Sequence, residues 1–452
     1  MNWTRLIIAV SFLLMSGLAA ADELSVTVYN SNLGVVSETR KLDFEKGTGK
    51  LAFRDVPSLI DAASVRFDLL DPGRNVVILE QNYAYDLVAP EKLYSRYLDN
   101  QIELQDKDGG LYAGTLLAYS GGAVTLMEES GKVKVVSLGN IVQTNFPKLP
   151  DGLITRPTLF WVYLSDFAGP LNCRVGYQTN GLNWEAEYVG LLNEKETRLD
   201  LSGWASINNQ SGKTFQDAKL KLIAGDINRA APPLRKGYEE SDRMIALSAS
   251  PMAFEEKAFF EYHMYTLPRA ATLANNEIKQ ISLFEPTTAS VKKVYYYRPQ
   301  RSSEDVQVVV EFVNSDQAGL GMPLPAGRVR IFKADSDGSL ILLGEDNLEH
   351  TPKDEEISLT IGNAFDIKGE ETLVNQTQVS KKVEEREFEI ELRNHKKEDV
   401  TIKIEKQLWG FWEITQSSHE YKKKDAGTVT FEVPVKADST ATVRFTVRFT
   451  TR

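Results

Sequence analysis

Alternation of apolar and polar residues at every second position dominates this chain. It is clearest over residues 306–312, 387–393, 401–405 and 442–449. This period of two is typical of half-buried β-strands. Turn-forming residues such as the DKDGG run at 106–110 separate the strands, and few stretches have the spacing of three and four that an amphipathic helix requires. The pattern predicts an all-β protein.

The first part of the chain is predicted to form two small modules. Residues 22–90 contain four or five short strand patterns and are expected to form a β-sandwich-like domain. Residues 91–150 contain five short, evenly spaced strands, which favour a compact SH3-like or Sm-like barrel near residues 97–146.

The remainder is predicted to contain a long central β domain and a terminal sandwich. The central domain covers residues 151–374, with an exposed loop near 230–251 that is rich in Ala, Pro, Ser and charged residues. Residues 375–452 have turns every eight to twelve residues, which predicts an immunoglobulin-like β-sandwich.

The first 21 residues have the charged, apolar and small-residue order of a secretory signal peptide. Arg5 precedes an apolar run over residues 6–18, and three alanines ending at Ala21 follow it. The run is shorter than the roughly 20 residues that a spanning helix needs, which favours a cleaved signal over a membrane anchor. We expect cleavage after Ala21 and a mature chain with no transmembrane segment.

The amino-acid composition indicates a cellular compartment and excludes one class of partner. The 452 residues include a single cysteine, Cys173, and carry a formal net charge of −11. One cysteine permits no intrachain disulfide, which in a long exported chain is typical of a bacterial periplasm. The acidic balance opposes binding to nucleic acid. The sequence predicts a periplasmic protein with no nucleic-acid partner.

A series of short motifs resembles a known family. The motifs are YQTNGLNW at 177–184, WASINN at 204–209, SGKTFQD at 211–217, EYHMYTL at 261–267, LPAGRVR at 324–330 and GNAFD at 362–366. Over roughly residues 150–452 the chain is similar to the domain of unknown function 4139 family, whose members include mucoidy inhibitor A-like chains. The resemblance implies no activity. Many members carry a coiled coil before this domain, whereas the segment here has no heptads and matches a small barrel.

Signatures of common catalytic and metal sites are absent from the sequence. The four histidines, His263, His350, His395 and His419, lie far apart and have no metal-ligand spacing. We therefore expect no metal, no cofactor and no catalytic residue that can be named. The alternatives are a zinc site assembled by the fold or a nucleophilic role for Cys173, whose apolar neighbours instead favour a buried position.

Two aromatic clusters are candidate partner-binding surfaces. Strand alternation places Trp409 and Phe411 on one face and Trp412 on the other, so one face is expected to be exposed. Tyr295 and Tyr297 share a face of a predicted strand that ends at a proline, which favours a docking edge. The alternative for both clusters is burial between modules.

Taken together, these patterns favour a non-catalytic envelope protein that binds or scaffolds another envelope component, either a protein or a polysaccharide. Edge strands and sandwich loops are the usual recognition elements of such modules. One alternative is an enzyme that acts on envelope glycan or peptide through scattered residues. Another is an assembly or stability factor for a surface structure.

Overall fold

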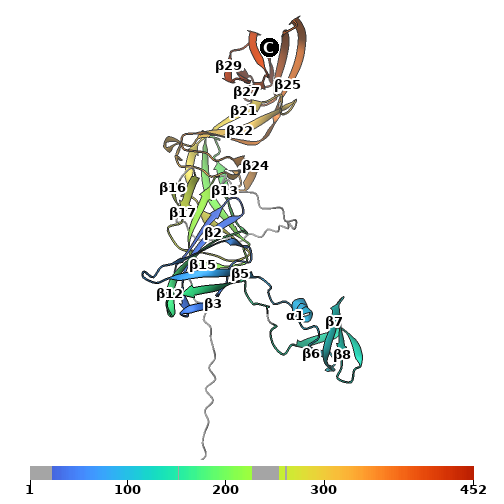
Figure 1. Ribbon diagram of the computed structural model, residues 1–452. Helices are drawn as coiled ribbons and strands as arrows, with labels where there is room; N and C mark the ends of the chain where they lie inside the picture. Colours follow the sequence, from blue (N-terminus) through green and yellow to red (C-terminus); the bar gives the residue numbers. More distant parts are fainter. Residues whose placement is uncertain (1–22, 151, 226–253, 260–261, 452) are drawn as a thin grey trace, which may run out of the picture.

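The computed structural model describes residues 23–150, 152–225, 254–259 and 262–451, and these residues fold almost entirely into β-strands (Figure 1). The all-β prediction is confirmed. The helical elements are α1 (Pro90–Arg96) and the 3-10 turns η1 (Leu138–Asn140) and η2 (Asp316–Ala318). No helix in the described ranges is long and apolar enough to cross a membrane. The predicted signal peptide and the loop near 230–251 lie outside the described residues.

Three sheets surround the largest hydrophobic core. The eight-stranded sheet contains, in spatial order, β16 (Glu255–Phe259), β17 (Tyr262–Thr266), β15 (Phe215–Ala224), β1 (Glu23–Tyr29), β2 (Leu33–Phe44), β12 (Gly169–Thr179) and β4 (Ile60–Leu69), with β18 (Ala271–Leu273) beside β15. The three-stranded sheet contains β3 (Gly47–Arg54), β11 (Thr158–Ser165) and β5 (Val76–Ala84). The six-stranded sheet contains β19 (Glu277–Ser282), β14 (Arg198–Asn209), β13 (Leu182–Leu192), β23 (Gly327–Ala334) and β24 (Leu340–Leu348), with β20 (Thr287–Ser290) beside β14.

The first strand lies in the interior of the eight-stranded sheet. β1 pairs in parallel with β15, with Ser25 opposite Lys219, and pairs antiparallel with β2 on its other side. The buried Val26 and Val28 belong to the same core as Trp184. Residues 22–90 therefore do not form a sandwich of their own, because later strands complete both of the sheets that they enter.

The predicted small barrel is an open sheet. Its five strands are confirmed, in the order β10 (Ile141–Asn145), β6 (Gln101–Asp106), β7 (Leu111–Ser120), β8 (Ala123–Met127) and β9 (Val133–Ser137). Over the described residues β9 and β10 remain as edges, so the sheet does not close into a barrel. Helix α1 shields the core instead, since Tyr94 stacks on Tyr119 with 4.9 Å between ring centroids. We call residues 90–146 the small module.

The C-terminal module is larger than predicted. Its nine-stranded sheet contains, in spatial order, β28 (Phe411–Ser417), β31 (Ser439–Thr450), β26 (Val383–Asn394), β25 (Glu356–Ser380), β22 (Asp305–Val313), β21 (Lys292–Tyr297), β27 (Val400–Gln407), β30 (Thr428–Val435) and β29 (Tyr421–Asp425). Three of these strands precede or straddle residue 375, where the sequence placed the boundary. Figure 1 shows this module and the small module at opposite ends of the molecule.

The small module is inserted between two adjacent strands. Ala84, the last residue of β5, lies opposite Thr158, the first residue of β11, in an antiparallel ladder. We predict that replacing residues 86–156 with an Asn-Gly turn leaves the other sheets folded, because that turn suits a tight hairpin. The melting temperature and far-ultraviolet circular dichroism of the shortened chain should match those of the parent. Loss of cooperative unfolding would show that the small module is needed for the rest of the fold.

Candidate functional site

The structure separates the two predicted aromatic clusters by their exposure. Trp409 is 80% exposed and Phe411 is 55% exposed. Tyr295 is 7% exposed, and Tyr297 is completely buried, with its hydroxyl donating to the Ser303 carbonyl at 2.8 Å. The predicted docking edge at the tyrosines is not an edge, because β21 pairs with β22 on one side and with β27 on the other.

The exposed position of Trp409 follows from the loop between β27 and β28. Leu408 is buried and its N–H donates to the Gly427 carbonyl at 2.7 Å, while Gly410 has a left-handed φ of 82°. The chain thus turns sharply just after a fixed residue, which leaves Trp409 pointing away from the core. Trp412 lies on the face of β28 opposite to Phe411. It packs against the core, and its indole N–H donates to the Ala426 carbonyl at 2.9 Å.

The loop lies at the end of the C-terminal module that is remote from the six-stranded sheet. β27 starts at Val400, which lines a pocket together with Lys195 and Thr197, just after β13. The strand runs away from that junction towards Trp409. Phe411 lies opposite Thr450 on β31. We call the exposed residues Trp409, Phe411 and Val379 and the adjacent Lys381 and Lys382 the distal tip.

The distal tip is suited to contact rather than to catalysis. Flat, exposed aromatic side chains stack on sugar rings or insert into the surface of a partner protein. Edge strand β29 lies close to β28, since Lys423 Nζ is 4.3 Å from the centroid of the Trp412 ring. It carries three consecutive exposed lysines at 422–424, and charged edge strands resist unspecific pairing. The tip therefore offers one aromatic surface beside a positively charged edge.

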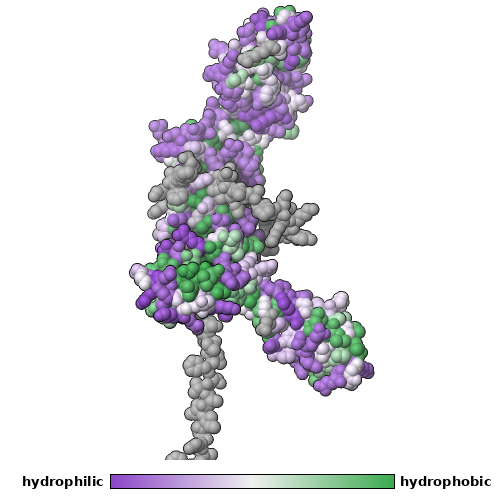
Figure 2. Space-filling view, viewed as in Figure 1, coloured by the Kyte–Doolittle hydropathy of each residue, from purple (hydrophilic) through white to green (hydrophobic). Residues whose placement is uncertain are grey.

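A second apolar surface lies on the three-stranded sheet. Figure 2 shows hydrophobic residues gathered on the part of the molecule that contains β5. The exposed side chains there include Val77 and Leu79 on β5 and Phe160 and Leu164 on β11, with Leu164 directly opposite Val77. Alternation along the sequence does not predict this surface, because apolar residues occupy both faces of β5 and β11 and no face is marked as the outer one.

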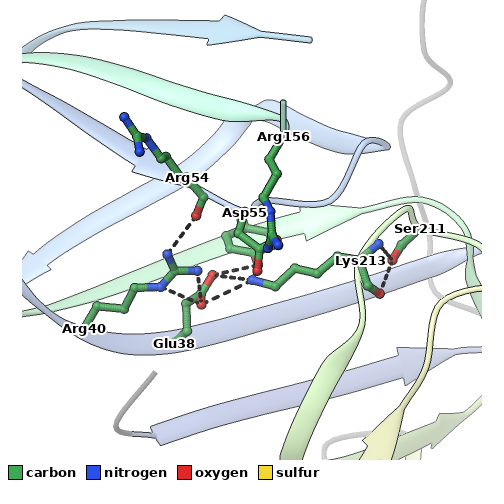
Figure 3. Close-up of polar contacts among 8 residues, drawn as sticks. Glu38, Arg40, Arg54, Asp55, Arg156, Ser211 and Lys213 are labelled. Carbon is green, nitrogen blue, oxygen red and sulfur yellow. Dashed lines mark hydrogen bonds and ion pairs between the residues drawn. The ribbon is translucent and has the colours of Figure 1, made fainter. Parts of the chain in front are cut away.

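A buried cluster of charges joins several segments of the chain (Figure 3). At its centre is the carboxylate of Glu38, on β2. Arg40 donates to it from Nε and Nη2 at 3.0 and 2.6 Å, and Lys213 Nζ lies 3.2 Å from Oε1. The Tyr177 hydroxyl, on β12, donates to the same carboxylate at 2.8 Å. One carboxylate thus holds side chains from two paired strands and from the loop before β15.

Arg40 extends this cluster to the three-stranded sheet. Its Nη1 donates at 2.8 Å to the carbonyl of Arg54, the last residue of β3. Its guanidinium lies 4.1 Å from the centroid of the Phe53 ring. The adjacent Asp55 pairs with Arg156 at 2.9 Å. The contacts of Arg40 with Arg54 and Phe53 fix the three-stranded sheet against β2.

We call the buried residues Glu38, Arg40, Lys213 and Tyr177 the lock, because their mutual contacts join separate segments of the chain. Burial lowers the pKa of Lys213, although the Glu38 carboxylate opposes this change. Burial, followed by the charge of Glu38, raises the pKa of Tyr177 well above its usual value, so the phenol remains a hydrogen-bond donor. Glu38, Lys213 and Tyr177 have almost no exposed surface. A substrate would reach them only if the sheets separated.

Comparison with known protein families assigns most of the chain to one of them. Residues 173–451 match the sequence profile of the family described as Domain of unknown function (DUF4139). The match covers more than half of the chain. This chain belongs to the DUF4139 family. No curated protein matches it.

The DUF4139 domain is completed by strands that precede it. The match begins in β12, yet the sheet that contains β12 and β15 has β1 and β2 between them. The lock has the same division, since Glu38 and Arg40 precede the matched region whereas Tyr177 and Lys213 lie inside it. The distal tip belongs entirely to the DUF4139 domain.

A pocket of about 430 Å³ in the DUF4139 domain is the nearest approach to an acid–base site. It gathers His350 with Glu349, Glu355 and Glu356. His350 lies in the loop after β24, and its Nδ1 accepts a hydrogen bond from the Ala326 N–H at 3.1 Å. The three carboxylates are exposed to solvent. Within the described ranges no group of His, Cys, Asp and Glu side chains is arranged to hold a metal ion.

We predict that Glu38→Gln lowers the free energy of unfolding by about 3–5 kcal/mol, because it leaves the buried Arg40 and Lys213 without a counter-charge. Chemical denaturation monitored by tryptophan fluorescence measures this change. The matched control is Glu23→Gln on β1, whose ion pair with Lys219 is exposed. The control should leave the denaturation midpoint unchanged. Equal behaviour of the two variants would contradict the lock.

We predict that Cys173 reacts with a thiol reagent only when the chain unfolds. The side chain is fully buried in β12, and burial, followed by the charge of Asp71, raises its pKa to about 12. Labelling at pH 8 should therefore proceed at the unfolding rate. Rapid labelling of the native chain would contradict this position.

The raised pKa also has a consequence for stability. The thiol of an unfolded chain ionises near pH 8.5, so above that pH the unfolded state binds fewer protons than the native state and stability falls as pH rises. The loss of stability between pH 8 and pH 10 should be smaller for Cys173→Ala than for the parent chain. An identical loss in both would show that the thiol titrates alike in the two states.

Proposed function

We propose that this DUF4139 protein is exported to the periplasm and acts there as a non-catalytic envelope protein that binds or scaffolds another envelope component through its distal tip. The observation that carries the proposal is the 80% exposure of Trp409 beside Phe411 on a framework of paired strands. The signal-peptide pattern of residues 1–21 and the single cysteine support the compartment.

Exposure of these two rings favours recognition because burial against a partner would recover a large apolar area. Tryptophan is among the residues that contribute most to binding when it enters a desolvated interface. The buried Leu408 and the hydrogen bond between Trp412 and Ala426 fix the loop on both sides. A fixed loop loses little conformational entropy on binding.

The alternative function is an enzyme that acts on envelope glycan or peptide. The observation in its favour is the pocket that contains His350, Glu349, Glu355 and Glu356. The carboxylates of this pocket are exposed to solvent, whereas catalytic acids and bases are commonly shielded from it. We therefore place binding first. An assembly factor for a surface structure would use the same tip and form a stable complex with one protein.

We predict that Trp409→Ala abolishes partner or glycan retention and changes the free energy of unfolding by less than about 0.5 kcal/mol, as expected of an exposed residue. The control is Trp184→Ala, which removes a fully buried ring and should cost about 3–5 kcal/mol. A large loss of stability in Trp409→Ala would assign this residue to the core.

Cross-linking in cells of the native host identifies the partner. If the partner is a protein, a photoreactive amino acid at position 409 should form a specific covalent adduct with it on irradiation. If the partner is a polysaccharide, irradiation should cross-link the protein covalently to purified envelope polysaccharide. The matched position is 85, because Tyr85 is a similarly exposed aromatic residue remote from the tip. The same adducts from both positions, or no adduct from 409, would contradict the proposal.

A further inference from the structure

Strand β25 departs twice from regular pairing at the junction between the six-stranded and nine-stranded sheets. The register with β22 shifts between Val308 and Val309, and shifts again between Asp305 and Gln307. At the second shift, two steps along β22, from Asp305 to Gln307, lie opposite five steps along β25, from Lys368 to Asn363. The extra residues of β25 form a bulge, and bulges commonly redirect side chains beside functional sites.

The bulge produces an exposed phenylalanine. Phe365 is 92% exposed, whereas Ile367, two residues further along, is completely buried. Regular alternation would place these two side chains on the same face of the strand. The sequence pattern predicted no such exposure, and only the irregular register accounts for it.

A pocket of about 310 Å³ lies against this bulge. The bulge contributes residues 361–365, and the opposite walls are formed by Leu192 from β13 and by Tyr295 and Lys293 from β21. Lys396 also lines the pocket. The volume is at the lower end of the range for small-molecule sites, and such sites commonly form where two domains meet.

Two ammonium groups face the tyrosine in this pocket. Lys293 Nζ and Lys396 Nζ each lie 5.5 Å from the centroid of the Tyr295 ring. Lys396 also donates to the Tyr295 hydroxyl at 3.1 Å and to Glu398 at 3.0 Å. Lys293 pairs with Glu196. Each ammonium has three donors, so hydrogen-bonding capacity remains for a ligand.

Both lysines remain charged at neutral pH. Burial acts to lower the pKa of Lys396, but hydrogen bonds to Tyr295 and Glu398 outweigh it and the pKa is raised. The pKa of Lys293 is raised in the same way by Glu196 and Tyr295. The pocket lining therefore combines apolar walls with two ammonium groups and one carboxylate. That carboxylate, Glu196, is shared between Lys293 and Lys333, so an excess of positive charge remains.

We propose that this junction pocket binds a small amphipathic anion, with the apolar body against Phe365, Leu192 and the bulge and one acidic head group at Lys293 and Lys396. The neighbouring pocket, of about 570 Å³, shares Lys293 and Tyr295. That pocket also shares Glu196 with the junction pocket and carries four further carboxylates, Glu311, Glu398, Asp399 and Glu432. These charges disfavour a second acidic group on the ligand. The proposal is independent of the distal tip.

The test uses 1-anilinonaphthalene-8-sulfonate as the probe and neutral N-phenyl-1-naphthylamine as its uncharged counterpart, with the full chain at physiological salt. We expect one sulfonate probe per chain by isothermal titration calorimetry. Lys396→Met and Phe365→Ser should each weaken its binding about tenfold, the loss of one charge-assisted or stacking contact. The affinity of the neutral probe should be unchanged in Lys396→Met.

Three controls decide the result. Lys396→Arg retains the charge and should retain the affinity, which separates loss of binding from misfolding. Lys382→Met removes an exposed lysine at the distal tip, and Trp409→Ala removes its exposed aromatic ring. Neither change should alter the titration. Unchanged affinity in both pocket variants, or loss of binding in a tip variant, would overturn the proposal.

Discussion

The position of β1 between β15 and β2 is the constraint on which the remaining architecture depends. The parallel ladder from Ser25 opposite Lys219 to Tyr29 opposite Ile223 joins segments almost two hundred residues apart. Neither the eight-stranded sheet nor its core is complete without this strand. Pairing at such a separation requires closure of a long loop before any contact stabilises it, which makes the fold slow to form and cooperative once formed.

The Glu38 cluster stabilises the same arrangement by a different kind of interaction. Hydrophobic burial favours contact between the sheets but does not by itself fix their relative register. A buried carboxylate with donors from Arg40, Lys213 and Tyr177 has a single satisfied geometry, because each unpaired partner would be costly. At the junction with the nine-stranded sheet, β25 enters that sheet while its residues Ile357 and Leu359 remain in the main core. The bulge of β25, and with it the junction pocket, lies where the strand passes from the main core into the nine-stranded sheet.

The sequence predicted those features that depend on local alternation. The strands at 306–312, 387–393, 401–405 and 442–449 are present in β22, β26, β27 and β31. The opposed faces of Phe411 and Trp412 were also predictable, since period-two alternation within β28 fixes them, whereas the exposure of Trp409 comes from the loop before this strand. The five strands of the small module followed from the same pattern.

Features that depend on contacts between segments far apart in the sequence cannot be predicted from local alternation. Nothing local indicates that β1 pairs with β15 or that β21 is an interior strand, so the first module and the tyrosine edge were both predicted incorrectly. Glu38 and Arg40 occupy inward positions of β2, where alternation alone gives no reason to expect buried charge. Two partners of Glu38, Tyr177 and Lys213, lie more than a hundred residues away, on β12 and in the loop before β15.

Native-state hydrogen exchange of the β1 amides tests the account most directly. If β1 is integral to the main core, its amides should exchange as slowly as those of β15 and β13 and through the same global opening. In Glu38→Gln all three strands should then become faster together. Rapid exchange of β1 and β2 while β13 and β14 stay protected would show that the first strands are a separable unit and would contradict the account.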